Sequence, residues 1–588
     1  MFWDTEAEIE QLNEKSECHR VKLIVWRVVD LDECGQIIKD EWGHTADIEE
    51  YINQVEASAI NNGHLYLICH NASYDVQISG IITRLFKRDW RHTGSVLQFP
   101  PFIFHLKRAN KRLTLLDSLN YARHSLAALG KSIGLEKGEY DYRIKGVTED
   151  LVAYAYQDVK ILSEWFLSYY RFLVDNDLSP FATTLASQAF RTYRYRFFSG
   201  VIPLHREKDV QEIERFSYIG GRVECFRLGD FSGQTYYKLD VNSMYPYVMR
   251  EYDYPTVYLG SKPYINKAWF ETLHRTKYLI IKVKIKTRQP LFPVRLPDRV
   301  IYPVGEFETV LHSGEIELML RYAEDYKVVQ VYVYKREKIF SAYVDYFYIL
   351  KQDAERERDA VKRSIAKMFM NSLYGKFGQI GHHEILLDEG DPDGKFYRYQ
   401  GYSERHGCNV MINHIDGRET TTLNEGESYY SHPAIAGAVT SYARAYLMEM
   451  ILTAGIENLF YVDTDSLIVN QAGYDALADY MDADLLGALK LEGVENSIQI
   501  NGLKDYRFGN LVKIKGVSSK AVQLSDTQYS YPHFRGGVEW LKTGDTDRVY
   551  VTQQVKTLKR LYNKATLYEG RVSPFILPDP EIIPLSLP

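Results

Sequence analysis

Two aspartates separated by one residue stand in an otherwise apolar part of the chain. Asp463-Thr464-Asp465 is flanked by the apolar runs 459–462 and 467–469, a pattern that predicts a β-hairpin with both carboxylates at its tip. Like charges at a tight turn cost stability unless a cation lies between them. The segment therefore indicates a divalent-metal site, and an Asx turn that merely closes the hairpin is the alternative.

Another carboxylate, Asp240, ends the apolar run Tyr236–Leu239, and the cap-forming residues Asn242 and Ser243 follow it. Oxygen ligands from separate strands, without His or Cys, suit Mg²⁺ better than zinc. Two such ions about 3.5–4 Å apart would activate an attacking hydroxyl and stabilise the leaving oxygen of an in-line displacement. The two acidic segments together predict phosphoryl transfer.

A polar stripe is expected on a helix around residue 370. Lys367, Asn371 and Tyr374 are spaced i, i+4 and i+7, which places them on one helical face. A cation there could hold a triphosphate while the Tyr ring stacks on a base pair. Ordinary amphipathy, with the neighbouring Met, Phe and Leu residues in the core, is the alternative.

A second set of acidic residues lies near the N-terminus. Asp4 and Glu6 fall on one face of a strand, Asp75 follows an apolar run, and Asp158 lies one helical turn after Tyr154. Taken alone, these positions indicate no particular chemistry, and unrelated surface acids with a helix pair account for them.

The composition describes a folded protein with several domains. The chain has 588 residues, of which 45% are hydrophobic and 25% charged, and this length exceeds what one hydrophobic core supports. Five cysteines occur without a CxxC pair, which excludes a zinc knuckle and favours a reducing, intracellular environment. Neither a basic leader nor an apolar run long enough for a membrane span is evident, so we expect a soluble chain without a membrane partner.

The net charge of −7 argues mildly against a nucleic-acid ligand, because phosphates are bound by Lys and Arg. Basic residues nevertheless cluster at 107–112 and 556–564. Each cluster is either a contact surface for nucleic acid or a solvated face.

Hydrophobic patterning divides the chain into segments. Residues up to about 175 alternate short strands (Val21–Val29, His64–Cys69, Leu113–Leu116) with helical patterns, which predicts an α/β domain. The later segments predicted are a β-rich stretch (277–286 and 328–334), one charged helix from about Tyr343 to Tyr374, an inserted module of loops and hairpins (379–432), a helix (434–452) leading into strand 459–462, and a C-terminal subdomain of strands with a basic helical patch.

Three segments resemble motifs A, B and C of family B DNA polymerases, in the family's order. They are Asp240-Val-Asn-Ser-Met-Tyr-Pro246, Lys367-x3-Asn371-Ser-Leu-Tyr374-Gly375 and Tyr461-Val-Asp-Thr-Asp465-Ser466. The resemblance implies that Asp240 and Asp465 are metal ligands, helped by the Val241 carbonyl, with Asp463 in a supporting role.

Further roles follow from the same resemblance. Lys367 would bind the incoming triphosphate together with Asn371 and Tyr374, and Tyr245 would exclude a ribose 2′-hydroxyl, so that the product is DNA. The expected DNA contacts are Tyr218, Gly220 and Gly221 of a YxGG segment, Lys504 and Tyr506 of a KxY element, and Lys513 and Lys515. Glycine in the YxGG segment would let the backbone approach the template.

The N-terminal acidic set resembles the three exonuclease motifs of proofreading polymerases, an RNase H-like site. The resemblance implies that Asp4, Glu6, Asp75 and Asp158 hold two metals and that Tyr154 orients the attacking water. Single-stranded DNA would be held by Asn71, Tyr74, Ser118, Leu119 and Lys137.

Two features depart from the family pattern at this start. Only three residues precede Asp4, fewer than a central strand normally has, and Ala7 stands where a threonine is expected. We therefore expect a trimmed start, and hypothesise that proofreading is weakened while polymerisation is intact.

The implied fold is multidomain, α/β and α+β: an RNase H-like 3′→5′ exonuclease domain and a right-hand polymerase with two insertions. The expected parts are the exonuclease (1–178), palm (179–251), first insertion (252–341), fingers (342–378), second insertion (379–433), palm (434–518) and thumb (519–588).

The insertions match in position the two terminal-protein regions of protein-primed polymerases of phages and linear plasmids. That resemblance implies a replicase in a host cytoplasm, with two Mg²⁺ or Mn²⁺ ions per active site. Its partners would be template and primer DNA, dNTPs and a terminal priming protein, and it would displace strands. The alternatives are a primer-independent or nucleic-acid-primed relative, a catalytically silent DNA-binding protein and a nuclease without polymerase activity.

Overall fold

The computed structural model describes the chain except residues 99, 206, 264–265, 382, 404–406, 424–426, 429, 519, 535, 537–546, 569 and 578–588. The N-terminal part is built on a ten-stranded mixed sheet. Its strands are β1 (Phe2–Asn13), β2 (Ser16–Leu31), β3 (Ile37–Thr45), β4 (His64–Cys69), β5 (Arg91–Leu97), β6 (Phe102–Arg108), β7 (Lys111–Asp117), β25 (Val522–Gln523), β26 (Gln528–Phe534) and β27 (Val549–Thr557). The order is β25-β26-β27-β2-β1-β4-β7-β6-β5, with β3 paired to β2.

Helices cover both faces of this sheet because its central strands are apolar on both sides. They are α1 (Ile48–Ser58), α2 (Ala72–Ser79), α3 (Ile81–Phe86), α4 (Leu126–Ser132) and α5 (Glu149–Asp175). Phe2 and Val25 belong to the core that includes α5, whereas their neighbours Trp3 and Ile24 belong to the core that includes α1 and α3. This arrangement confirms the predicted α/β domain, and β1 extends well beyond Glu6 in spite of its short lead-in.

A seven-stranded antiparallel sheet carries the second group of acidic residues. Its strands are β8 (Val223–Cys225), β9 (Gly229–Val241), β20 (Leu459–Asp463), β21 (Ser466–Asn470), β22 (Leu489–Gly502), β23 (Asp505–Phe508) and β24 (Leu511–Ile514), in the order β24-β23-β22-β9-β21-β20-β8. Helix α14 (Pro433–Ala454) is buried along most of its length and packs beside α8 (Met244–Glu251) and α15 (Gln471–Ala476). The hairpin predicted at residues 459–469 is confirmed.

The predicted single charged helix is wrong, because the structure divides it into a helical hairpin. α11 (Ser341–Glu357) ends at Arg358, whose φ of 60° is left-handed, and Asp359 caps α12 (Ala360–Ser372) by accepting from the Lys362 N–H. A short α13 (Tyr374–Phe377) follows. No Gly or Pro marks the break, so the sequence pattern gave no sign of it.

Two smaller sheets correspond to the predicted insertions. The first contains β10 (Tyr254–Pro263), β11 (Tyr278–Thr287), β14 (Val304–His312), β15 (Asp325–Glu337) and β30 (Ile576–Leu577), with helices α9 (Lys267–Thr276) and α10 (Ser313–Tyr322) and the short pair β12 (Val294–Arg295) and β13 (Val300–Ile301). The second is four-stranded: β16 (His383–Glu389), β17 (Phe396–Ser403), β18 (Cys408–Ile415) and β19 (Arg418–Leu423). Helices α6 (Leu185–Thr192) and α7 (Lys208–Ser217) and a π-helical turn (Tyr193–Phe197) precede β8.

The C-terminal residues do not form the separate subdomain that the sequence predicted. β27 pairs with β2 of the N-terminal sheet, Lys564 donates to the Val223 carbonyl of β8, and β30 adds to β14 of the first insertion. The pair β28 (Thr566–Tyr568) and β29 (Arg571–Ser573) lies between these attachments. No helix is found in the described residues of 556–564, so the predicted basic helical patch is wrong as well.

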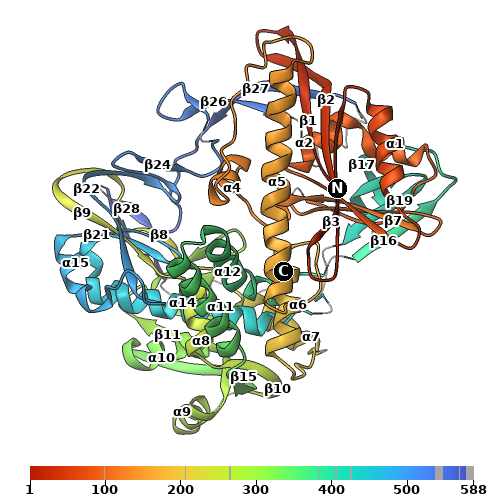
Figure 1. The fold of residues 1–588 in the computed structure, drawn as a ribbon. Helices are drawn as coiled ribbons and strands as arrows, with labels where there is room; N and C mark the ends of the chain where they lie inside the picture. Colours follow the sequence, from red (N-terminus) through yellow and green to blue (C-terminus); the bar gives the residue numbers. More distant parts are fainter. Residues whose placement is uncertain are drawn as a thin grey trace.

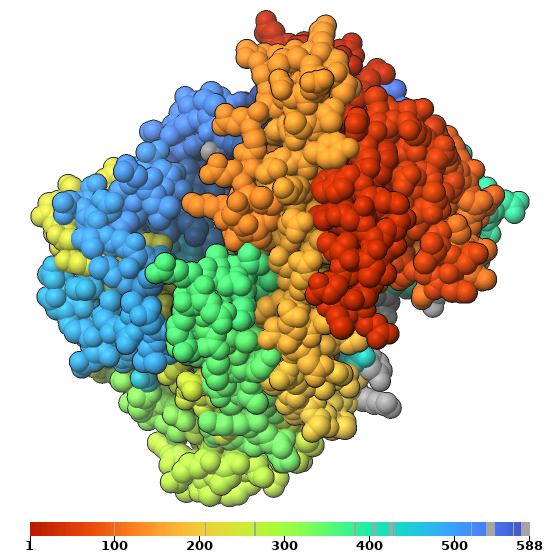
Figure 2. Space-filling view, viewed as in Figure 1, coloured from red at the N-terminus to blue at the C-terminus, as the bar shows by residue number. Residues whose placement is uncertain are grey.

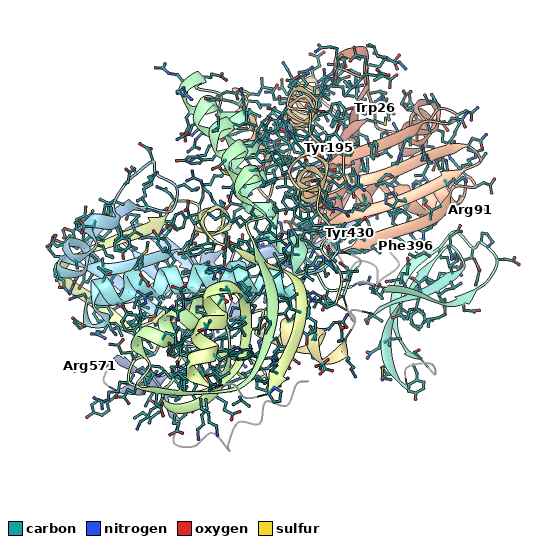
Figure 3. All side chains as sticks on the ribbon, turned by 90° about the horizontal axis from the view of Figure 1, so that it is seen from below. Trp26, Arg91, Tyr195, Phe396, Tyr430 and Arg571 are labelled. Carbon is teal, nitrogen blue, oxygen red and sulfur yellow. The ribbon has the colours of Figure 1, made fainter. Side chains whose placement is uncertain are left out.

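In Figure 1, α5 runs between the N-terminal sheet and the rest of the molecule, and the four-stranded sheet lies beside the N-terminal sheet. Phe396 of β17 packs its ring 5.4 Å from that of Phe104 (Figure 3). Arg91 forms an ion pair with Asp416 at 3.2 Å across the same junction. The second insertion is therefore anchored to the N-terminal domain by a buried aromatic contact.

We expect Phe396→Ala to loosen this attachment, since removing a buried Phe ring costs about 3–5 kcal/mol. Hydrogen exchange should quicken in β16 to β19 and remain slow in the seven-stranded sheet. Tyr402→Ala, at a position of the same strand that is 64% exposed, is the matched control and should change little. Unaltered exchange in Phe396→Ala would contradict the anchoring role.

Candidate active sites

The turn between β20 and β21 brings Asp463 and Asp465 to the end of β9. Asp240 lies opposite Ser466 in the β9–β21 pair, and the Val241 N–H donates to the Asp465 carbonyl at 2.7 Å. The Asp465 N–H donates to the Asp463 carbonyl, also at 2.7 Å. Three carboxylates that are far apart in sequence thus share one end of the sheet.

Thr464, at the centre of this turn, has a left-handed φ of 64°. Its N–H donates to the Arg222 carbonyl at 2.7 Å, and a Cβ at Gly221 would lie 2.7 Å from Thr464 Cγ2. Only glycine fits at 221, because a side chain there would displace the turn. The close approach that Gly221 permits is therefore to the carboxylate turn. Gly220 is exposed, with open space at its Cβ position.

The carboxylates of this turn lie in electrostatically different surroundings. Burial, and then the neighbouring charge of Asp465, raises the pKa of Asp240 to about 7. Burial also raises the pKa of Asp465. Asp463 instead forms an ion pair with Lys504 at 3.0 Å. The negative charges of Asp240 and Asp465 are therefore poorly neutralised, whereas that of Asp463 is neutralised by Lys504.

The residues predicted to bind a nucleotide lie on the side of the turn that faces the helical hairpin. Lys367 and Asn371 are exposed on α12, and the positive charge of Lys367 favours the ionised form of Asp240, which lowers that pKa. The ring of Tyr245 lies 4.5 Å from that of Tyr374. Val241 is fully buried beneath them in the sheet.

The residues predicted to contact primer DNA gather at the same end of the sheet. The Lys504 N–H donates to the Tyr461 hydroxyl at 2.9 Å, and the Tyr461 and Tyr506 rings are 5.0 Å apart. Lys513 pairs with Tyr506 in the β23–β24 ladder, and the Lys515 N–H donates to the Lys504 carbonyl. The ring of Tyr218 lies against Gly378 at the base of the helical hairpin, where a Cβ would lie 2.3 Å from it.

The N-terminal site brings Asp4, Glu6 and Asp158 together, with one carboxylate oxygen of each within 4.8 Å of the others. Burial and the charge of Asp158 raise the pKa of Asp4 to about 7, and burial and the charge of Asp4 raise that of Glu6 to about 9. Lys137 forms an ion pair with one oxygen of Asp158, while the other, Oδ1, is buried without a hydrogen-bond partner.

Asp75 does not join this cluster. Its carboxylate accepts from the Thr5 hydroxyl at 2.6 Å and from the Thr5 N–H at 3.2 Å. Burial and the charge of Asp4 raise the pKa of Asp75 well above its usual range. The predicted set of four carboxylates is thus a close set of three with Asp75 held beside it.

Of the other residues predicted for the exonuclease site, Tyr154 and Lys137 lie beside the three carboxylates. The Tyr142 hydroxyl donates to the Tyr154 hydroxyl at 3.1 Å, and Lys137 Nζ lies 4.6 Å from the centre of the Tyr154 ring. The predicted single-strand contacts have partners of their own: Ser118 with His70 at 2.8 Å, Tyr74 with His19 at 2.8 Å, the Leu119 N–H and the Asn71 N–H with Asp117 at 2.9 and 3.0 Å.

Sequence reasoning missed four residues in these sites: Thr5, Tyr142, Lys238 and Glu492. Thr5 is the variable position of an Asp-x-Glu pair, and Tyr142 lies in an irregular segment, so neither has a periodic signal. Glu492, which adds negative charge near Asp240 and pairs with Lys238, lies at a break in the β9–β22 register. Only Lys238 and Glu492 could have been located, and only if the pairing of β9 with β22 had been known in advance.

Both donor sets fit hard divalent cations. Each consists of carboxylate oxygens without His or Cys, and oxygen is the ligand atom that Mg²⁺ and Mn²⁺ prefer. Binding of a cation would give the buried Asp158 Oδ1 a partner and would lower the raised pKa values of Asp4, Glu6 and Asp240.

The surface in Figure 2 is hollowed between the blue C-terminal strands, α4 and the green helices α11 and α12.

Replacing Glu6 by Gln should stabilise the metal-free protein. Glu6 and Asp4 hold their protons more tightly in the folded state, so stability falls as pH rises from about 4, where unfolded carboxyls titrate, towards 9. Thermal unfolding in EDTA should therefore show a higher Tm for Glu6→Gln at pH 8 and a smaller difference at pH 5. Glu8→Gln, at an exposed position of the same strand, is the control. A lower Tm at pH 8 would refute the repulsion.

Comparison with known proteins agrees with this architecture. The family model described as DNA polymerase type B, organellar and viral, matches residues 144–451. A probable DNA polymerase of Neurospora intermedia is 27% identical over 405 residues, covering 63% of this chain and 40% of the relative. The DNA-directed DNA polymerase of Enterobacteria phage PRD1 is 28% identical over 324 residues, covering 53% and 54%. The chain thus spans about half or less of these relatives' length.

Among solved structures, phi29 DNA polymerase complexed with primer-template DNA superposes with a TM-score of 0.68 at 16% identity, covering 95% of this chain and all of that one. This likeness confirms the predicted fold class over nearly the whole chain. Among the described residues, no helix is long and apolar enough to cross a membrane.

Proposed function

The chain belongs to the organellar and viral type B DNA polymerases, and on that premise we propose that it is a DNA-directed DNA polymerase with its own 3′→5′ exonuclease. The observation that carries the proposal is the meeting of Asp240 and Asp465 at one end of β9 and β21, beneath the exposed Lys367 of α12. Primer-template DNA and dNTPs are the proposed substrates. The proposed parts keep the predicted boundaries, except that the thumb segment is joined by strand pairing to the N-terminal sheet and to the first insertion.

In the proposed polymerase site, Asp240, Asp465 and the Val241 carbonyl would hold two Mg²⁺ or Mn²⁺ ions, and such ions would activate the primer hydroxyl and neutralise the triphosphate. Lys367 binds the phosphates of the incoming nucleotide. The paired rings of Tyr245 and Tyr374 form the floor for its sugar and base, and so exclude a 2′-hydroxyl. Lys504 neutralises Asp463 and lies with Tyr506 at the primer end, with Lys513 and Lys515 beside them along the primer strand.

In the proposed exonuclease site, Asp4, Glu6 and Asp158 would hold the metal ions, and Asp75 would contribute from its position beside Thr5. Tyr154 orients the attacking water, and Lys137, placed on Asp158, contacts the phosphate to be cleaved. Asn71, Tyr74, Ser118 and Leu119 line the path of the single strand. Tyr218, Gly220 and Gly221 are proposed to lie along the template between the two sites.

Two substitutions should separate the activities. Asp465→Asn is expected to slow primer extension at least roughly a thousandfold, because a two-metal site loses a ligand, and to leave degradation of single-stranded DNA intact. Asp158→Asn should do the reverse. Both rates are measured on labelled oligonucleotides with Mg²⁺, and Asp479→Asn, on the palm surface, is the control.

Primer extension that survives in Asp465→Asn would show that the sites are wrongly assigned. A wild-type chain that binds DNA but does neither reaction would support the silent DNA-binding alternative. A chain that degrades DNA but extends no primer would support a nuclease alone.

We further propose protein priming and strand displacement in the replication of a phage or plasmid genome within a host cytoplasm. The support is the position of the two inserted sheets, one between Asp240 and Lys367 and one between Tyr374 and Asp463. A nucleic-acid-primed relative would have the same catalytic residues.

If priming uses a protein, purified enzyme with labelled dATP, Mn²⁺ and an extract of the source cells should attach dAMP to a protein hydroxyl without any oligonucleotide. The label should be lost with protease and absent with Asp465→Asn. Labelling that requires an oligonucleotide primer would favour the nucleic-acid-primed alternative.

A further inference from the structure

The segment 217–222, which supports the carboxylate turn, is held by polar side chains from the first insertion. His312 Nε2 contacts the Ser217 hydroxyl at 2.9 Å, and Arg295 donates to the Tyr218 carbonyl. The insertion thus reaches from the sheet containing β14 into the palm. The contacts are made in the interior, because His312 and Ser217 are both buried.

Arg444 of α14 completes this support. Its Nη1 donates to the carbonyls of Ile219 and Gly220, the latter at 2.9 Å. Its Nε and Nη2 bind Glu315 Oε1 of α10 at 2.9 and 2.7 Å. Ser441 donates to the other oxygen of Glu315 at 3.0 Å. One guanidinium therefore links the insertion to two consecutive backbone carbonyls of the palm.

The buried ion pair between Arg444 and Glu315 contributes little net stability. Arg444 and Glu315 are each only 3% exposed at the side chain, and the desolvation of two buried charges offsets much of their attraction. An apolar pair of similar volume often stabilises a protein as well. What an apolar pair does not provide is the planar fork of donors that fixes the Ile219 and Gly220 carbonyls.

The segment 217–222 contacts the polymerase turn directly. Two residues beyond Gly220, the Arg222 carbonyl accepts from the Thr464 N–H, and Gly221 packs against the Thr464 side chain. Thr464 separates Asp463 from Asp465. A displacement of the 217–222 segment would therefore displace the turn and with it Asp465, whose charge acts on Asp240.

Two glycines show how closely the parts of this support approach. A Cβ at Gly437 of α14 would lie 2.7 Å from His312 Nε2, and one at Gly314 of α10 would lie 2.7 Å from the Tyr442 ring. Glycine inside a helix costs about 1 kcal/mol relative to alanine. The close packing of α10 on α14 explains why glycine is present at both places.

We infer that Arg444 and Glu315 are positioning residues for the polymerase carboxylates, and that the first insertion is thereby an integral part of the polymerase site. The inference rests on the proposed polymerase function. It assigns to Arg444 a role in fixing the Asp463–Asp465 turn, with no contact to the nucleotide.

The test compares three variants on a primed DNA template. Arg444→Lys keeps the charge but lacks the fork, and should lower kcat for nucleotide addition about 10- to 100-fold with little change in KM for dNTP. The double variant R444M/E315L removes both buried charges, and should keep its Tm within a few degrees while polymerising as slowly as Arg444→Lys. Glu306→Gln breaks the half-exposed Lys284–Glu306 pair of the same insertion and should behave as wild type.

Degradation of single-stranded DNA is the internal control and should be unchanged in all three variants. Polymerisation at the wild-type rate by R444M/E315L would overturn the inference, since the pair would then be only structural. An equal loss of both activities would overturn it too. A wild-type chain that extends no primer would refute the proposed function itself, so the two failures are distinguishable.

Discussion

The burial of carboxylates that repel one another is the constraint on which both sites depend. Neighbouring negative charges that are shielded from water interact far more strongly than at a surface, and here burial, followed by the charge of a neighbouring carboxylate, raises the pKa of Asp4, Glu6 and Asp240. In each site one carboxylate has a lysine, Lys137 at Asp158 and Lys504 at Asp463. The remaining carboxylates stay uncompensated, which is the arrangement that binds cations.

Such repulsion is tolerated only where the backbone is fixed by distant parts of the chain. The turn at Thr464 is fixed by the Arg222 carbonyl, and helix α2, which carries Asp75, packs under β27. There Ile78 lies in a small buried cluster with Ala7 and Val549. Ala7, which departs from the family pattern, is thus part of the contact with the C-terminal strand. A larger polar side chain would have to fit among these apolar groups.

The sequence was sufficient for features that depend on neighbouring residues. The alternating strands, the hairpin at Asp463–Asp465 and the exposed stripe of Lys367 and Asn371 follow from local periodicity and agree with the structure. The break at Arg358 was missed because its left-handed conformation has no glycine to indicate it. The attachments of β27 and β30 were missed because strand pairing between distant segments has no local signal.

The carboxylates were likewise easier to predict than their surroundings. Motif spacing placed Asp4 and Glu6 on one face of a strand, which the cluster with Asp158 bears out. It could not show that Asp75 bonds to Thr5, because that contact depends on the docking of α2 against β1. Motif spacing likewise could not show the contact between Arg444 and Glu315, because these residues are 129 positions apart. Residue types indicate possible ligands, whereas long-range packing decides how each ligand is held.

Helix α5 shows how packing also fixes the relation between the two sites. Tyr154 and Asp158 lie towards its N-terminal end, while Tyr169 and Phe172 near its C-terminal end pack their rings 6.4 and 6.0 Å from Phe369 of α12. From Asp158 to Phe172 the helix rises about 21 Å, at 1.5 Å per residue. Phe369 is two residues from Lys367. Because a continuous helix resists compression, the carboxylates of the N-terminal site and the helix that carries Lys367 are kept at a set separation by one element.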